Sequence, residues 1–270
     1  MEISNDKYRV KINFLFMFFL SIILGLLNVQ CLLAEETGLN KNWKSLADKK
    51  VFFGHQSVGE NILDGINDVT SGTLQVSHFK EGVFDNVGSF SHARVGENFD
   101  PISKIDAFYE NISKANVKPD IAFLKLCYVD INKDTDIENI FEYYQSVMLK
   151  INADFPDIKL IHLTAPLKVN KTSWKTTVKK MLGRDLWEYA DNVARNRYNK
   201  MVLDAFGGTG LVFDIASAEA TQTDGSINSF DYKGDTYLAM IDDYSDDGGH
   251  LNEKGRRHVA IKLLNFLVEN

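Results

Sequence analysis

Two short segments near opposite ends of this chain carry residues that could do chemistry. Asp247 lies three residues before His250, and a carboxylate at that spacing on a loop can hold an imidazole in one tautomer. Ser57 lies between a short apolar run and a helical pattern, which would present its hydroxyl at a turn. A hydroxyl, an imidazole and a carboxylate are the nucleophile, base and orienting acid of acyl transfer. The sequence therefore predicts Ser57 as nucleophile, His250 as base and Asp247 as acid.

Each of these residues also has a purely structural interpretation. Ser57 could act only as a helix N-cap, because serine is a favoured capping residue. His250 could be a surface loop histidine, and the acidic residues around it could form a solvated loop. Asp246, one residue away from the expected spacing, is the second candidate for the orienting acid.

The overall composition argues against several classes of protein. The chain has 270 residues and a net charge of −7, whereas a nucleic-acid-binding face would be clustered and basic. The six histidines are scattered along the sequence and two cysteines cannot supply a set of thiolates, so we expect no metal site. The predicted chemistry also needs no cofactor. The expected partner is a small-molecule or carbohydrate ester.

The first forty residues differ from the rest. Lys7, Arg9 and Lys11 precede a mainly apolar stretch that reaches Ala34 and stops at two glutamates, a pattern typical of an export signal. The stretch is about one bilayer crossing long, so an uncleaved membrane anchor is the alternative. We expect a signal or anchor at 1–36, a linker at 37–48 and a domain at 49–270, outside the cytoplasm in either case: secreted, periplasmic or anchored.

Beyond residue 50, short apolar runs alternate with helical patterns. Strands are expected at 51–53, 74–79, 121–124, 160–163 and 211–214. Helices are expected at 58–69, 100–112, 136–151, 185–206 and 252–268. This alternation predicts an α/β fold with a mainly parallel five-stranded sheet covered on both faces. Ligands of such sheets bind beyond the carboxyl ends of the strands, where Ser57 would lie. Two apparent insertions, 168–184 and 221–244, would flank that edge as substrate-shaping loops.

From residue 50 onward the chain resembles the SGNH (GDSL-like) hydrolases. The strongest match is the segment 247–252, DGGHLN, because the family has an Asp-x-x-His pair before its last helix. The segment 53–57, FGHQS, matches the family's Gly-Asp-Ser block loosely. The resemblance implies a flavodoxin-like three-layer sandwich and esterase activity.

The resemblance also implies an oxyanion hole formed by three groups. The family uses the N–H of the nucleophilic serine, a glycine N–H after the second strand and an asparagine side chain after the third. Gly96 is the best match for the glycine and Gly88 the alternative. Val129 stands where the asparagine is expected and cannot donate. Asn98 is the substitute we expect, although it could instead only help to start the next helix.

Three further residues lie at the predicted site. His55 and Gln56 adjoin the nucleophile, and Asp130 keeps the last acid of the block after the third strand. We expect all three to bind substrate. Asp130 could instead brace its loop or cap the following segment, and His55 could be structural.

The sequence therefore predicts an exported serine esterase with Ser57, His250 and Asp247 as its triad, for which an acylated carbohydrate is a plausible substrate. An O-acyltransferase of the same fold is one alternative. A non-catalytic glycan-binding protein is the other, because the expected asparagine donor is missing.

Overall fold

The computed structural model describes residues 43–80, 82–83, 90–170 and 189–270. The expected export segment, Gly88 and most of the insertion 168–184 lie outside these ranges. Within them, no helix has both the length and the apolar character that crossing a bilayer requires.

Short strands alternate with helices along the described chain, as the sequence predicts. The elements, in chain order, are η1 (Trp43–Asp48), β1 (Val51–His55), α2 (Ser57–Thr70), β2 (Val76–His78), β3 (Phe90–Arg94), α3 (Pro101–Lys114), β4 (Ile121–Leu124), α4 (Ile137–Asp154), β5 (Lys159–Leu163), α6 (Ala190–Phe206), η3 (Gly207–Thr209), β6 (Val212–Phe213), α7 (Ile215–Ala220), β7 (Ser229–Tyr232), β8 (Asp235–Leu238), η4 (Asp242–Tyr244) and α8 (Glu253–Glu269).

The central sheet has six strands in the order β2-β3-β1-β4-β5-β6, and all its neighbours run parallel. Five of them, β3-β1-β4-β5-β6, follow the flavodoxin-like order, and β2 adds an edge strand. The expectation of five strands is therefore wrong by one. The missed strand is β3, whose polar residues Ser91, His92 and Arg94 hide its pairing with β1.

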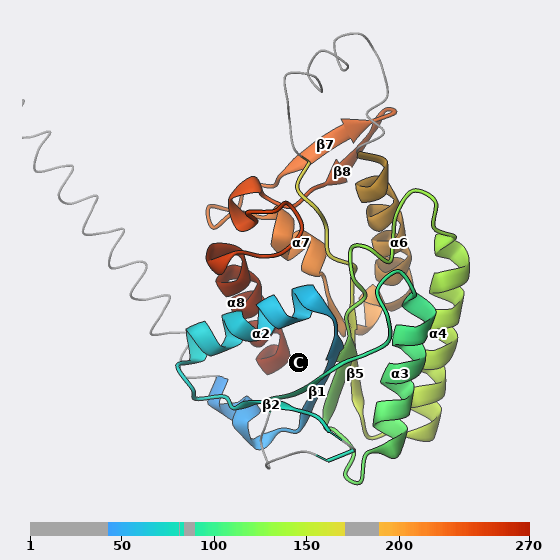
Figure 1. Cartoon of the computed structure of the whole chain (residues 1–270), viewed down its shortest axis with the longest axis vertical. Coiled ribbons are helices and arrows are strands. Elements are labelled where there is room, and N and C mark those ends of the chain that lie inside the picture. The colour runs from blue at the N-terminus through green and yellow to red at the C-terminus, as the bar shows by residue number, and fades with distance from the viewer. Residues whose placement is uncertain (1–42, 81, 84–89, 171–188) are drawn as a thin grey trace, which may run out of the picture. The chain divides into compact units, whose positions relative to one another are not determined.

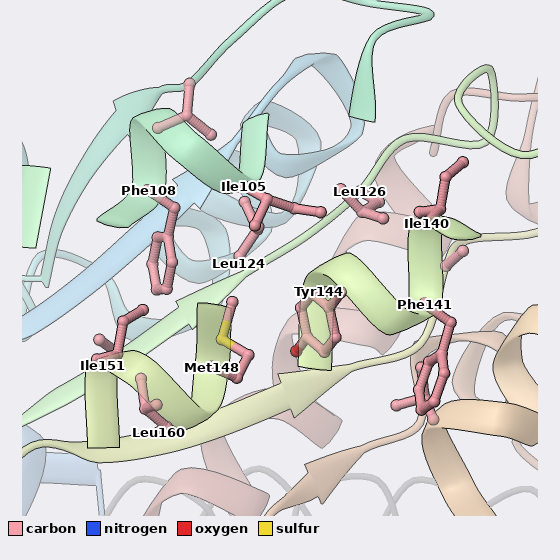
Figure 2. Packing of buried hydrophobic residues seen from close by; sticks show 14 of the residues in the cluster. Ile105, Phe108, Leu124, Leu126, Ile140, Phe141, Tyr144, Met148, Ile151 and Leu160 are labelled. Atoms are coloured by element: carbon pink, nitrogen blue, oxygen red, sulfur yellow. The ribbon is translucent and has the colours of Figure 1, made fainter. Parts of the chain in front are cut away.

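Helices cover both faces of the sheet and give a three-layer α/β sandwich (Figure 1). Helices α2 and α8 pack against each other on one face, and α3, α4 and α6 cover the other. Figure 2 shows the packing on that second face, where apolar side chains of α3 and α4 meet those of β4 and β5, among them Ile105, Phe108, Leu124, Tyr144, Met148, Ile151 and Leu160. This continuous core holds the strand ends in place and with them the loops that follow.

The segment expected as a linker up to residue 48 is partly structured. Trp43 and Leu46 in η1 are buried, and the Trp43 indole donates to Asn265 Oδ1 of α8 at 3.0 Å. The compact unit therefore begins at Trp43. The insertion 221–244 contains the antiparallel hairpin β7–β8.

Candidate active site

The two distant segments singled out in the sequence meet at the carboxyl edge of the sheet. Gln56 is the N-cap of α2 without a capping side-chain bond, so Ser57 is the first helical residue rather than the cap. The Ser57 hydroxyl lies 3.0 Å from His250 Nε2, and His250 Nδ1 lies 2.6 Å from Asp247 Oδ2. Because a carboxylate only accepts, Nδ1 is the protonated nitrogen and Nε2 accepts from Ser57.

The acid is held by more than the imidazole. Asp247 Oδ1 accepts the backbone N–H groups of Gly249 and His250, each at 2.8 Å. Partial burial works to raise the pKa of Asp247, but the hydrogen bonds donated by His250 and Gly249 outweigh it and hold the pKa well below its ordinary value. Asp246, the second candidate, instead accepts from Asn252 Nδ2.

Tyr128 is a neighbour of this triad whose role we did not predict. Its ring meets that of His250 edge to face, with centroids 5.7 Å apart. Arg195, which is buried, donates through Nε to the Tyr128 carbonyl at 2.9 Å, and Lys168 lies over the ring. Burial, followed by the charge of Asp247, raises the pKa of Tyr128, which keeps the phenol neutral. The feature of the sequence that could have indicated Tyr128 as a site residue is its position in the loop that follows β4.

Two backbone N–H groups near Ser57 have no hydrogen-bond partner among the described residues. One belongs to Ser57 itself, at the positive end of the α2 dipole, and the other to Gly96. Gly96 has a φ of 55°, and a Cβ there would lie 2.4 Å from the backbone nitrogen of Lys104, so no larger residue fits. Both N–H groups are available to an oxyanion.

Gln56 connects these two parts of the site. Its Nε2 donates to the carbonyl oxygens of Val95 and Gly96, at 3.0 and 2.7 Å. Both amide hydrogens are therefore used by the protein. Gln56 therefore ties the Gly96 loop to the turn that carries Ser57, and its expected role in substrate binding stays a prediction.

His55 and Asp130 are buried and do not line the site. His55 is fully buried, with Nδ1 donating to the Gln56 carbonyl and Nε2 accepting from His92 Nδ1 at 2.9 Å. Asp130 is bound to Lys104, and both side chains are inaccessible to solvent. The expectation that they bind substrate is corrected: their oxygen and nitrogen atoms are used inside the protein. Asp130 braces its loop instead.

Asn98 is exposed on the loop after β3, two residues beyond Gly96. Its Oδ1 accepts from Lys104 Nζ at 3.0 Å, while Asp100, not Asn98, caps α3. The amide nitrogen of Asn98 has no partner among the described residues. This leaves it free to act as the substitute donor.

The sheet also gathers histidines that are far apart in the sequence. His55 and His92 lie on adjacent strands, and with Glu60 they bring three potential metal ligands within 4.8 Å of one another. Each is engaged by protein groups, since the histidines bond to each other and Glu60 pairs with Arg94 at 3.3 Å. Burial lowers the pKa of His55 to about 3 and that of His92 to about 4, so both are neutral near pH 7.

A cavity of about 410 Å³ lies beside the loop of the acid and histidine. Most of its lining residues are polar, and the described ones are Asn170, Tyr189, Gln222, Asn228, Ser229, Phe230, Ala239, Ile241, Asp242 and Asp243. Asp243 is four residues before Asp247, and Val169, next to Asn170, donates its N–H to the Gly248 carbonyl at 3.0 Å. The cavity therefore adjoins the loop that carries Asp247.

In its fold the chain is similar to several solved structures, one of which is described as a lipolytic protein of the G-D-S-L family. No family model matches the sequence, and no curated protein does. A solved structure described as a platelet activating factor from Streptococcus pneumonia covers 92% of this chain and 99% of its own, at 15% identity and a TM-score of 0.49.

Two further solved structures are similar at a comparable level. A lipolytic protein of the G-D-S-L family from Desulfitobacterium hafniense covers 81% of this chain and 99% of its own, at 9% identity and a TM-score of 0.48. A peptidoglycan O-acetylesterase covers 68% of this chain and 48% of its own, at 14% identity and a TM-score of 0.43. These likenesses concern the fold. The chemistry that follows depends on the distances in this chain.

Proposed function

We propose that this protein is an exported serine esterase that hydrolyses a carboxylic ester through Ser57, His250 and Asp247. The observation that carries the proposal is the hydrogen-bonded chain from Ser57 Oγ to His250 and on to Asp247, at 3.0 and 2.6 Å. This chain joins residues 193 positions apart in the order nucleophile, base and orienting acid that acyl transfer requires. The apolar segment with a basic start before residue 36 supports export.

The reaction would follow from the positions of these atoms. Ser57 Oγ attacks the ester carbonyl carbon while His250 Nε2 takes its proton, and Asp247 stabilises the imidazolium that forms. The N–H groups of Ser57 and Gly96, with the amide of Asn98, receive the charge on the carbonyl oxygen. His250 then protonates the departing alcohol. A water molecule, deprotonated by the same imidazole, releases the acid from the acyl-serine.

The polar cavity beside the Asp247 loop supports an alcohol portion rich in hydroxyl groups. Amide and carboxylate groups such as those of Gln222 and Asp242 bind hydroxyl groups, and both residues line the cavity. The lining residues that the structure describes include carboxylates and amides but no lysine or arginine, which favours a neutral, hydroxyl-rich group over an anionic one. We therefore propose an acylated carbohydrate as the substrate class.

Labelling with a fluorophosphonate probe, followed by peptide mapping, tests the nucleophile directly. We expect the probe on Ser57, with no labelling and no hydrolysis of p-nitrophenyl acetate in Ser57→Ala. The matched control is Ser146→Ala, which changes an exposed serine of α4 and should label like the wild type. Both variants should unfold at nearly the wild-type temperature. Hydrolysis retained in Ser57→Ala would refute the assignment.

A further inference from the structure

A buried ion pair lies behind the loop that follows β3. Lys104 Nζ of α3 contacts the two carboxylate oxygens of Asp130 at 2.7 and 2.6 Å, and both side chains are 0% exposed. Taking two charges out of water is costly, and such a pair persists only when the remaining hydrogen-bonding groups are also satisfied. The partners of these remaining groups therefore show which segments of the chain the ion pair keeps in position.

Both members of the pair reach the loop between β3 and α3. The third N–H of Lys104 goes to Asn98 Oδ1 at 3.0 Å, and Asp130 Oδ1 accepts the backbone N–H of Phe99 at 3.0 Å. Asp130 Oδ2 accepts the Cys127 N–H at 2.6 Å and so fastens the pair to the segment after β4. Two successive residues of the loop after β3, Asn98 and Phe99, are thus tied to the segment after β4, on the far side of β1 in the sheet.

The loop needs such support because its conformation is unfavourable. Phe99 has a φ of 69°, in the left-handed region that a bulky side chain seldom adopts, and its side chain is 75% exposed. An exposed side chain contributes little burial energy to offset this conformation. A backbone conformation of this kind is found only where the surrounding structure imposes it. The bond from the Phe99 N–H to Asp130 supplies that constraint.

The same network determines how the Asn98 amide is turned. An ammonium group can only donate, so the oxygen of Asn98 must face Lys104 and its NH₂ group must face away. That NH₂ group has no partner among the residues that the structure describes. It is carried by the same loop as Gly96, which Gln56 ties to the turn of the nucleophile at 2.7 Å.

We propose that Lys104, paired with Asp130, is a positioning residue that orients Asn98 as the third donor of the oxyanion hole. The inference rests on the proposed function, because it requires an oxyanion at Ser57. The proposal also accounts for Val129, which stands where the resemblance predicts the asparagine donor and which cannot donate. The donor comes from the loop after β3, and a buried cation behind it sets its orientation.

A cycle of variants measured on p-nitrophenyl acetate tests this role. Asn98→Ala removes the donor, and the double variant Lys104→Met with Asp130→Asn removes the pair without leaving a buried charge unpaired. We expect each to lower kcat by on the order of 100-fold with KM little changed, since one oxyanion donor is lost in both. Because both changes act through one group, the triple variant should be no slower than Asn98→Ala. A triple variant slowed by the product of the two effects would overturn the proposal.

Asn98→Asp separates the donor from the structure of the loop. A carboxylate keeps the bond to Lys104 but has no N–H to offer, so the loop should stay in place and thermal unfolding should occur at the wild-type temperature or above. We expect kcat to fall as far as in Asn98→Ala. Wild-type kcat in Asn98→Asp would also overturn the proposal, and this test holds even if the double variant does not fold.

The outcomes also distinguish this inference from the proposed function. Hydrolysis that depends on Ser57, combined with additive effects in the cycle, would leave the esterase in place and remove only the role of Lys104. A wild-type protein that neither hydrolyses the ester nor reacts with the fluorophosphonate would remove both.

Discussion

The Gln56 side chain donates a hydrogen bond of 2.7 Å to the Gly96 carbonyl and a second one to the Val95 carbonyl. Gln56 directly precedes Ser57, and Gly96 carries one of the free N–H groups. Together with the backbone bond from the Val95 N–H to the His55 carbonyl, this side chain holds the Gly96 loop against the turn that carries Ser57. A catalytic geometry held in this way loses rate when the group that holds it is changed.

Gln56→Glu should be more damaging than Gln56→Ala. Alanine removes two donors, whereas ionised glutamate places acceptor oxygens against two carbonyl oxygens. We expect kcat on p-nitrophenyl acetate to fall about 10- to 100-fold in the alanine variant and further in the glutamate variant, with KM nearly constant. Steady-state kinetics would check this. A rise in KM with normal kcat would indicate that Gln56 binds substrate after all.

Gly59 is required by His55, which packs beneath the first turn of α2. A Cβ at Gly59 would lie 2.3 Å from the Cβ of His55. We expect Gly59→Ala to lower the free energy of unfolding by about 1–3 kcal/mol, measured in urea, because the overlap forces the turn and the strand apart. The turn carries Ser57, so esterase activity should fall as well.

Gly207→Ala is the matched control. A Cβ there meets nothing within 4 Å, and its φ of −57° suits any residue. This variant should be as stable as the wild type or slightly more stable. Equal free energies of unfolding for the two alanine variants would show that close packing against His55 does not restrict position 59 to glycine.

Asp247→Asn tests the tautomer of His250. The new NH₂ group would face Nδ1, which would then have to accept, and the proton would move to Nε2. Ser57 would lose its base, so kcat should fall by about 10³- to 10⁴-fold. Because Asp247 is largely exposed, thermal unfolding should change little. Activity within tenfold of the wild type would show that Asp247 does not orient the imidazole.

The stability of the protein should fall as the pH is lowered from about 6.5 towards 4. Burial lowers the pKa of His55 to about 3 and the pKa values of His92, His162 and His258 to about 4. The folded state therefore keeps these rings neutral, while the unfolded chain protonates them below its pKa of about 6.5. Between these values the unfolded state binds more protons, so the free energy of unfolding decreases as the pH falls.

Urea unfolding at several pH values would measure this slope. The variant His162→Phe removes one of the four groups, and it should unfold with a shallower dependence on pH between 6.5 and 4, whatever its stability at pH 7. The phenyl ring can keep the stack on Phe206, where the histidine ring lies 3.7 Å away. An unchanged slope would contradict the neutral buried histidine.

The sequence by itself was sufficient for the order of most elements. The apolar run 121–124 coincides with β4, and the aspartates before α3 and α4 are the N-caps. The spacing of Asp247 and His250 predicted their contact, because three loop residues span a distance that a carboxylate can bridge. These features are local: each depends on side chains a few positions apart.

Only the tertiary structure decided which distant groups meet. Ser57 and His250 come together because β1 ends at the edge of the sheet where the loop before α8 also lies. The bond from Gln56 to Gly96 and the buried pair of Lys104 and Asp130 each join segments 26 or more residues apart. A polar strand such as β3, or a lysine inside a helix, looks solvent-exposed in a sequence. Its burial depends on partners that the register of the sheet brings to it, and residue spacing carries no information on them.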